Sequence, residues 1–126
     1  MRIGIDMDDT ITDTWNYMLE DVSKEFNIEL SMLKEKKNAY AKLLTDDFGI
    51  SLDEYCQKMQ PVYQRHVLNL PLQKEADKYI NKLHDEGNEI YFITARETLF
   101  YNDPYGLSKE YLTKNNIYFD KLITDA

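Results

Sequence analysis

Cysteine, proline and glycine are scarce in this sequence, whose 126 residues include one cysteine, three prolines and four glycines. The single cysteine, Cys56, excludes a disulfide within the chain and is typical of a reducing compartment. No apolar run approaches the roughly 20 residues that a membrane-spanning helix needs. The first residues, Met1 to Gly4, lead directly into a strand pattern without a signal peptide. We therefore expect a soluble, cytoplasmic protein without a membrane partner.

Positively charged residues are also few. The sequence has 23 acidic residues but 15 lysines and arginines, so the formal net charge is −8. Recognition of a nucleic-acid backbone requires clustered Lys and Arg, so this balance argues against a nucleic-acid polymer as partner. A small phosphate ester is compatible with it, provided that a bound metal supplies positive charge locally. The hydrophobic fraction of 43% suffices for a core, and the length fits one domain, or one domain with a small insertion.

The stretch from Ile3 to Thr10 combines a short apolar strand pattern with three acidic residues that follow directly. In open α/β sheets, ligands bind at the carboxyl ends of the strands, where these acids would lie. Asp6 and Asp8 are two residues apart, so an extended chain points both carboxylates to one side. Two such charges repel unless a cation or a proton lies between them, which suits a bound divalent metal and a carboxylate nucleophile. The alternative is that the acids end the strand and cap the next helix.

Apolar spacing predicts the order strand, long helical segment, helix, strand, helix and strand. The expected helices are an apolar stripe from Trp15 to Phe26 capped by Thr12 or Asp13, a stretch over 31–44, a segment capped by Ser51 and kinked or divided by Pro61, one ending at Gly87 and one ending at Asn115. The expected second and third strands are 89–94, buried throughout, and 117–123. Strands that alternate with helices favour a parallel sheet. A crossover needs only about a dozen residues, so the excess after the first strand predicts a helical insertion.

The order Asp6-x-Asp8-x-Thr10 after an N-terminal strand resembles motif I of the haloacid-dehalogenase-like (HAD-like) phosphohydrolases. Thr94, at the end of a hydrophobic strand, is similar to motif II of this superfamily. The form Ile93-Thr94-Ala95-Arg96, followed by 102–106, is similar to the 5′-nucleotidase C-type, deoxyribonucleotidase-like branch. The resemblance implies an α/β fold: a HAD-like Rossmannoid parallel sheet built from residues 1–16 and 71–126, with a helical cap at 17–70 inserted after the first strand.

The same resemblance implies a role for each motif residue. Asp6 would attack phosphorus and form an aspartyl-phosphate, and Asp8 would act as general acid and then as general base. The Asp6 carboxylate and the Asp8 backbone carbonyl would hold Mg²⁺. Thr94 and the Ala95 amide would bind the phosphoryl group, whereas Arg96 either faces the substrate or pairs with a carboxylate. The implied activity is Mg²⁺-dependent hydrolysis of a small phosphorylated metabolite, such as a nucleoside monophosphate.

The sequence departs from this family in its last residues, because a motif III lysine and motif IV acidic residues are expected from a further helix and strand. Lys121 and Asp125 are of the right types, but the third strand should lie two places from the first, too far from Asp6. We therefore expect the C-terminal part of the core to be missing. A second hypothesis follows: a chain that binds metal or phosphate without efficient turnover. The first strand would also be an unpaired edge, so a homodimer or strand-exchanged assembly is a secondary hypothesis.

Other residues have simpler explanations. His66 and His84 have no partner at metal-ligand spacing, so we predict structural roles for both. Trp15 belongs to the apolar stripe, which favours core packing over stacking on a nucleobase. A phospho-accepting receiver domain is disfavoured, because the long helical insertion does not belong in that fold.

Overall fold

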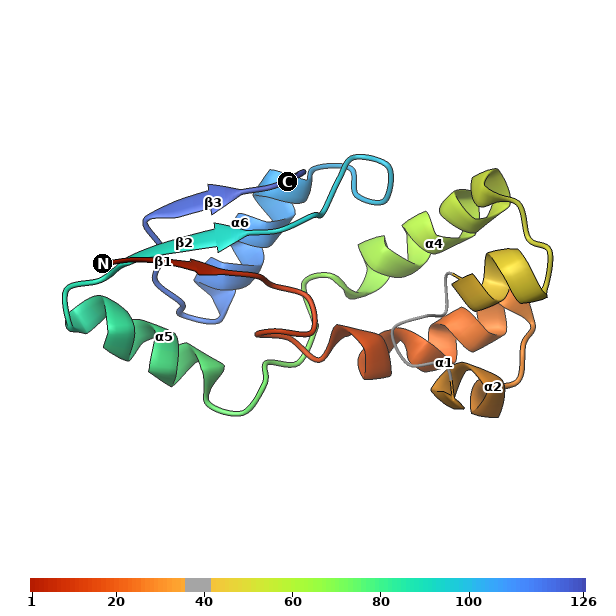
Figure 1. The fold of residues 1–126 in the computed structure, drawn as a ribbon, viewed down its shortest axis with the longest axis horizontal. Helices are drawn as coiled ribbons and strands as arrows, with labels where there is room; N and C mark the ends of the chain where they lie inside the picture. Colours follow the sequence, from red (N-terminus) through yellow and green to blue (C-terminus); the bar gives the residue numbers. More distant parts are fainter. Residues whose placement is uncertain (36–41) are drawn as a thin grey trace.

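The computed structural model describes residues 1–35 and 42–126, which form two lobes joined by neighbouring segments of chain (Figure 1). One lobe is a parallel sheet with helices α5 and α6, and the other lobe is helical. The elements, in chain order, are β1 (Arg2–Ile5), α1 (Thr14–Phe26), α2 (Leu30–Glu35), the π-helical turn η1 (Leu43–Asp47), α4 (Leu52–His66), α5 (Ala76–Asp85), β2 (Glu89–Ile93), α6 (Pro104–Lys114) and β3 (Lys121–Ile123). The expected α/β fold, a small parallel sheet with a helical insertion after the first strand, is confirmed.

The sheet has the order β1-β2-β3, and both strand pairs are parallel. β3 therefore lies two places from β1, as expected. It is shorter than the predicted strand 117–123, because the Asp120 carboxylate accepts the hydrogen bond of the Ile90 N–H at 2.7 Å in place of a strand carbonyl. Within residues 1–35 and 42–126, the outer edge of β1 pairs with no other strand.

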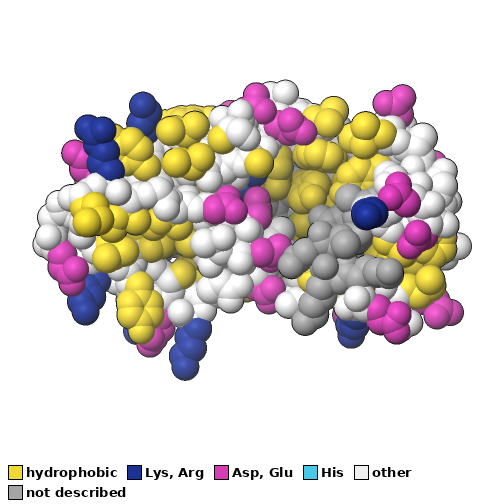
Figure 2. Space-filling view, viewed as in Figure 1, with side chains coloured by type: hydrophobic (Ala, Val, Ile, Leu, Met, Phe, Trp, Pro, Cys, Tyr) yellow, Lys and Arg dark blue, Asp and Glu magenta, His cyan; other side chains and the backbone are white. Residues whose placement is uncertain are grey.

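The two faces of the sheet differ in how they are covered. Ile90, Phe92 and Leu122 are buried in the core that α5 and α6 complete. Ile93 points to the opposite face and is 41% exposed, so the prediction that β2 is buried throughout is wrong for this face. Successive strand residues point to opposite sides, and the helices of the described chain cover one of them. Figure 2 shows hydrophobic side chains gathered on the surface of this lobe.

The helical lobe has its core between α1 and α4. The predicted stripe of α1 is buried from Trp15 to Phe26, and α4 contributes Tyr55, Met59 and Val62. Trp15 therefore packs in the core, as predicted. Ser51 caps α4 by accepting a hydrogen bond from the Glu54 N–H at 3.1 Å, and the helix continues through Pro61 without being divided.

The predicted helix over 31–44 is only partly seen. α2 ends at Glu35, and η1 begins at Leu43. Residues 36–41 lie outside the described part of the chain. Residues 103–106 form the N-cap and the first turn of α6, where Pro104 occupies an early helical position and the Asp103 carboxylate accepts a hydrogen bond from the Gly106 N–H at 3.0 Å. No helix of the described ranges is both long and apolar enough to span a bilayer.

The joint between the lobes consists of the segments 11–13 and 71–73. Thr12 and Leu72 form an isolated antiparallel bridge. The Asp13 N–H donates to the Pro71 carbonyl, and the Gln73 N–H donates to the Ile11 carbonyl, both at 2.8 Å. α1 begins directly after this joint at Thr14, inside the segment 1–16 that we assigned to the core.

Candidate active site

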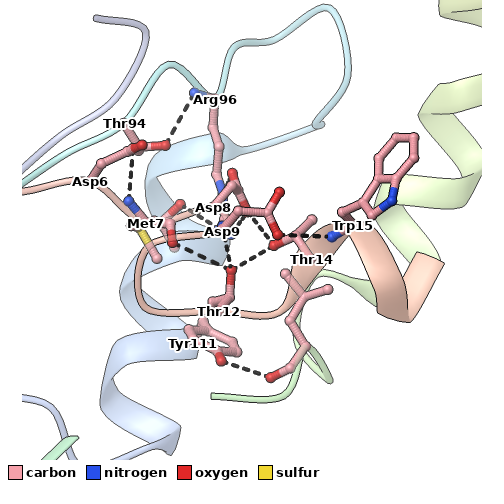
Figure 3. A network of polar contacts seen from close by, with 12 residues as sticks. Asp6, Met7, Asp8, Asp9, Thr12, Thr14, Trp15, Thr94, Arg96 and Tyr111 are labelled. Carbon is pink, nitrogen blue, oxygen red and sulfur yellow. Dashed lines mark hydrogen bonds and ion pairs between the residues drawn. The ribbon is translucent and has the colours of Figure 1, made fainter. Parts of the chain in front are cut away.

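A pocket of about 380 Å³ opens where β1 and β2 end. Asp6, Asp8, Thr94, Ala95 and Arg96 all line it. The carboxyl ends of two neighbouring parallel strands thus bring together every residue that the sequence suggested for the site, as Figure 3 shows for four of them.

The loop after β1 is a tight turn around one carbonyl. The Met7 carbonyl accepts hydrogen bonds from the N–H groups of Thr10 at 3.1 Å and Ile11 at 2.9 Å. Asp9 takes the left-handed conformation that this turn requires, with φ +58°. Asp6 accepts the Met7 N–H through Oδ1 at 2.8 Å. Its other oxygen, Oδ2, makes no hydrogen bond within the described residues, so one carboxylate oxygen is available at the mouth of the pocket.

Asp8 is held on both of its oxygens. Arg96 donates from Nε to Oδ2 at 3.0 Å and from Nη2 to Oδ1 at 2.9 Å, and the Thr14 hydroxyl donates to Oδ1 at 2.9 Å. Such a bidentate, charge-assisted pair fixes orientation as well as contributing energy. Figure 3 shows this carboxylate at the centre of the polar network.

Arg96 takes the carboxylate-pairing alternative. Its side chain is 1% exposed, and its third nitrogen, Nη1, donates to the Ser108 hydroxyl at 3.1 Å. Burial lowers the pKa of Arg96, but the hydrogen bonds and the charge of Asp8 outweigh burial, so that the pKa of Arg96 is raised. The guanidinium thus remains charged, and each of its three nitrogens donates one hydrogen bond to the protein. Direct contact between Arg96 and a substrate stays a prediction.

The start of α1 is bonded to the acidic loop. Asp13 stands at the N-cap position, but its side chain makes no capping bond, contrary to our expectation for Thr12 or Asp13. The Asp9 carboxylate caps the helix by accepting the Trp15 N–H at 3.0 Å. The Thr12 and Thr14 hydroxyls lie 2.6 Å apart. The capping by Asp9 agrees with the alternative that the acids of this loop cap the next helix. Thr14 was missed by sequence reasoning, because its role depends on the turn that folds residues 9–15 back onto Asp8.

Thr94 and Ala95 offer hydrogen-bond donors at the end of β2. Thr94 is buried, and its hydroxyl oxygen accepts the Arg96 N–H at 3.4 Å, which leaves its O–H free to donate. The Ala95 N–H has no partner within the described residues, and Ala95 lines the pocket. A free N–H beside a hydroxyl is suited to binding an anionic oxygen.

The opposite wall of the pocket is aromatic, and the sequence had not suggested it. Phe100 and Tyr101 come from the loop after β2, and Tyr63 comes from α4. The Tyr63 ring centroid lies 5.3 Å from those of both Phe100 and Tyr101. Burial, followed by the charge of Asp8, raises the pKa of Tyr101 far above its ordinary value, so its hydroxyl keeps its proton. The position of Phe100 and Tyr101 after a strand was a usable signal, whereas Tyr63 could be placed only by the fold.

The residues present fit a magnesium ion. In the part of the chain that the structure describes, no three His, Cys, Asp or Glu side chains form a metal-binding cluster. Mg²⁺ does not need one, because it commonly keeps several waters and binds through one or two carboxylates. The Asp6 carboxylate and the Asp8 backbone carbonyl would supply oxygen donors of the kind that it prefers. Lys121 and Asp125 do not line the pocket, as expected, although the Asp125 N–H donates to the Arg96 carbonyl at 2.9 Å.

No protein-family model and no curated protein matches this sequence. Solved structures do match its fold. A predicted phosphatase from Clostridium acetobutylicum is 16% identical with a TM-score of 0.69, and the match covers 98% of this chain and 60% of that one. A hydrolase from Streptococcus pneumoniae TIGR4 is 11% identical with a TM-score of 0.65, covering 98% and 65%. A phosphoserine phosphohydrolase-like protein from Francisella tularensis is 17% identical with a TM-score of 0.50, covering 98% and 58%.

These matches show a common fold. The chain shares the α/β architecture of structures described as phosphatases and hydrolases, which supports the HAD-like fold implied by motif I. It spans about three fifths of the length of the proteins that it matches.

Proposed function

We propose that this chain carries the nucleophile and the cap of a Mg²⁺-dependent phosphomonoester hydrolase. The observation that carries the proposal is the convergence of Asp6, Thr94 and the Ala95 N–H on one pocket at the carboxyl ends of β1 and β2. A carboxylate with a free oxygen stands there beside two donors suited to a phosphoryl group. The fold shared with a predicted phosphatase adds support.

In the proposed reaction, an Asp6 carboxylate oxygen attacks phosphorus and the bond from phosphorus to the ester oxygen breaks. Asp8 gives its proton to the departing alkoxide, so that an alcohol leaves. Asp8 then takes a proton from a water molecule that attacks the aspartyl-phosphate, which releases inorganic phosphate and restores Asp6. Splitting the hydrolysis into two displacements lowers each barrier. Thr94 and Ala95 hold the phosphoryl oxygens throughout.

Magnesium would be held by the Asp6 carboxylate and the Asp8 carbonyl, and when bound it neutralises phosphoryl charge. We infer a nucleoside monophosphate as the substrate class, on the similarity of 93–96 and 102–106 to the 5′-nucleotidase C-type branch. Comparing hydrolysis of nucleoside 5′-monophosphates with that of simple alkyl phosphates tests this assignment. Equal kcat/KM for both classes would contradict it.

The second candidate is a chain that binds metal and phosphate without efficient turnover. Arg96 is the one Lys or Arg that lines the pocket among the described residues, and Asp8 already engages it. Asp8 must exchange these contacts before it can reach an ester oxygen. This observation is the one that supports the second candidate.

Hydrolysis of p-nitrophenyl phosphate with and without Mg²⁺ separates the two candidates. We expect Mg²⁺-dependent turnover that Asp6→Asn abolishes. The matched control is Asp13→Asn, which changes a neighbouring acid outside the pocket and should retain activity. Calorimetric binding of inorganic phosphate with Mg²⁺, but no turnover that depends on Asp6, would establish the second candidate. If the protein shows neither phosphate binding nor turnover, both candidate functions are contradicted.

A partner remains part of the proposal. We infer that a second copy, by pairing or by strand exchange, covers the edge of β1, because this edge is unpaired in the described chain and such edges favour association. Light scattering during size-exclusion chromatography should then report a dimer. A folded monomer would contradict this assignment without affecting the site.

A further inference from the structure

Tyr101 is a buried residue whose hydroxyl has no partner. The residue is 4% exposed and lines the pocket, yet its hydroxyl forms no hydrogen bond within the described chain. The hydroxyl oxygen is not fully enclosed by protein atoms, and the residue lines the pocket. Another buried tyrosine, Tyr111, donates to the Leu70 carbonyl at 2.7 Å. Hydroxyls of buried residues usually have a hydrogen-bond partner, so a molecule that enters the pocket, a water or a ligand, would complete the bonding of Tyr101.

The surroundings of Tyr101 indicate which part of a ligand it meets. The Arg96 guanidinium carbon lies 5.5 Å from the centre of the Tyr101 ring, and the same guanidinium holds Asp8. Asp8 is the residue proposed to serve the ester oxygen. The ring also neighbours Tyr63, which continues the aromatic wall. Thr94 and Ala95, the phosphoryl donors, come from the end of β2 instead. These contacts place Tyr101 near Arg96 and Asp8, which is the leaving-group side of the pocket in the proposed reaction.

We propose that the Tyr101 hydroxyl is a specificity residue that donates a hydrogen bond to an oxygen acceptor on the leaving group of the phosphate ester. The class selected is an alcohol that carries ether or hydroxyl oxygens near its ester carbon, as sugar phosphates do. A plain alkyl phosphate of similar size offers the aromatic wall an apolar surface but gives Tyr101 no acceptor. This inference rests on the proposed phosphate-ester site and adds a residue to it.

The test compares the binding of three probes in the presence of Mg²⁺: ribose 5-phosphate, propyl phosphate and inorganic phosphate. Tyr101→Phe removes the hydroxyl and keeps the ring beside Arg96. We expect it to weaken ribose 5-phosphate about three- to tenfold, the size of one neutral hydrogen bond, with less than about a twofold change for the other probes. Tyr111→Phe is the matched control: it removes a structural hydrogen bond and should leave the preference for ribose 5-phosphate unchanged.

Any other result contradicts the proposed role of Tyr101, and one result also contradicts the proposed function. An equal loss for all three probes assigns Tyr101 to the phosphoryl group or to the fold, and no loss makes it a space-filling residue; either result overturns the proposal. If Tyr101→Phe does not fold, the wild-type chain decides, because equal affinity for ribose 5-phosphate and propyl phosphate contradicts the assignment. A wild-type chain that binds inorganic phosphate but shows no preference refutes the role of Tyr101 alone. One that binds none of the probes refutes the proposed function as well.

Discussion

The two loops that form the pocket are held in different ways. The loop after β1 is closed by its own bonds, with Met7 as a shared acceptor and Asp9 as the cap of α1. The loop after β2 depends on the helical lobe: the Asn102 N–H donates to the Gln64 side chain at 2.9 Å, and Phe100 packs on Tyr63. The proposed nucleophile, Asp6, is therefore fixed locally, whereas the wall proposed for recognition is placed by α4. Selectivity can change without disturbing the nucleophile.

The largest expected effect comes from breaking the contact that joins the loops, the pair of Asp8 and Arg96. Asp8→Asn leaves a buried guanidinium without its counter-charge, and we expect a loss of about 3 kcal/mol in the free energy of unfolding. Urea denaturation measures it. Because Asp8 is 32% exposed and can be hydrated, Arg96→Met should cost less. The double variant should be more stable than Asp8→Asn alone, and strictly additive losses would contradict the pairing.

A smaller effect is expected within the first loop. Thr14→Val keeps the shape of the side chain but removes its hydrogen bonds to Asp8 and Thr12, which should cost about 1–2 kcal/mol in urea denaturation. Thr10→Val, at an exposed threonine of the same loop, serves as control and should change stability by less than about 0.5 kcal/mol. Equal losses in the two variants would show that the loop is not closed through Thr14.

The second loop should respond to a change in the helical lobe. Gln64→Ala removes the acceptor of the Asn102 N–H, and we expect a loss of about 0.5–1 kcal/mol. Amide hydrogen exchange should quicken at 100–102 while residues 9–12 keep their protection. Gln57→Ala changes an exposed glutamine of the same helix and should leave both loops as they are. Faster exchange in the first loop as well would end the distinction between them.

The smallest expected effect is on how the stability of the protein depends on pH in the acid range. Burial raises the pKa of Asp21, but hydrogen bonds from His66 and Arg65 outweigh burial and leave this pKa below the ordinary value of 3.8. The contribution of Asp21 is therefore fully present above that value and is lost as the pH falls through its lower pKa in the folded state. We expect Asp21→Asn to reduce the loss of stability between pH 5 and pH 3 by under about 1 kcal/mol. An unchanged pH profile of unfolding would refute the role of this contact between α1 and α4.

Sequence patterns predicted what depends on periodicity and strand ends. The proximity of Asp6 and Thr94 could be predicted, because neighbouring parallel strands end at one edge of a sheet. The exposure of Ile93 could not, since it depends on which face the helices cover. Thr14 depends on the left-handed turn at Asp9, a conformation that an L-residue adopts only in a specific context. Tyr63 reaches the pocket through the packing of α4, which no local pattern encodes.

The joint at 11–13 and 71–73 has a consequence for how this protein can vary. Because the chain leaves the sheet and returns to it through hydrogen-bonded neighbours, the intervening helices can lengthen or shorten while the ends stay fixed. The entropic cost of closing such an inserted segment grows slowly with its length, by about 0.6 kcal/mol for each doubling. Variants of this chain can therefore acquire a larger or smaller helical lobe while the strand ends that carry Asp6 and Thr94 keep their register.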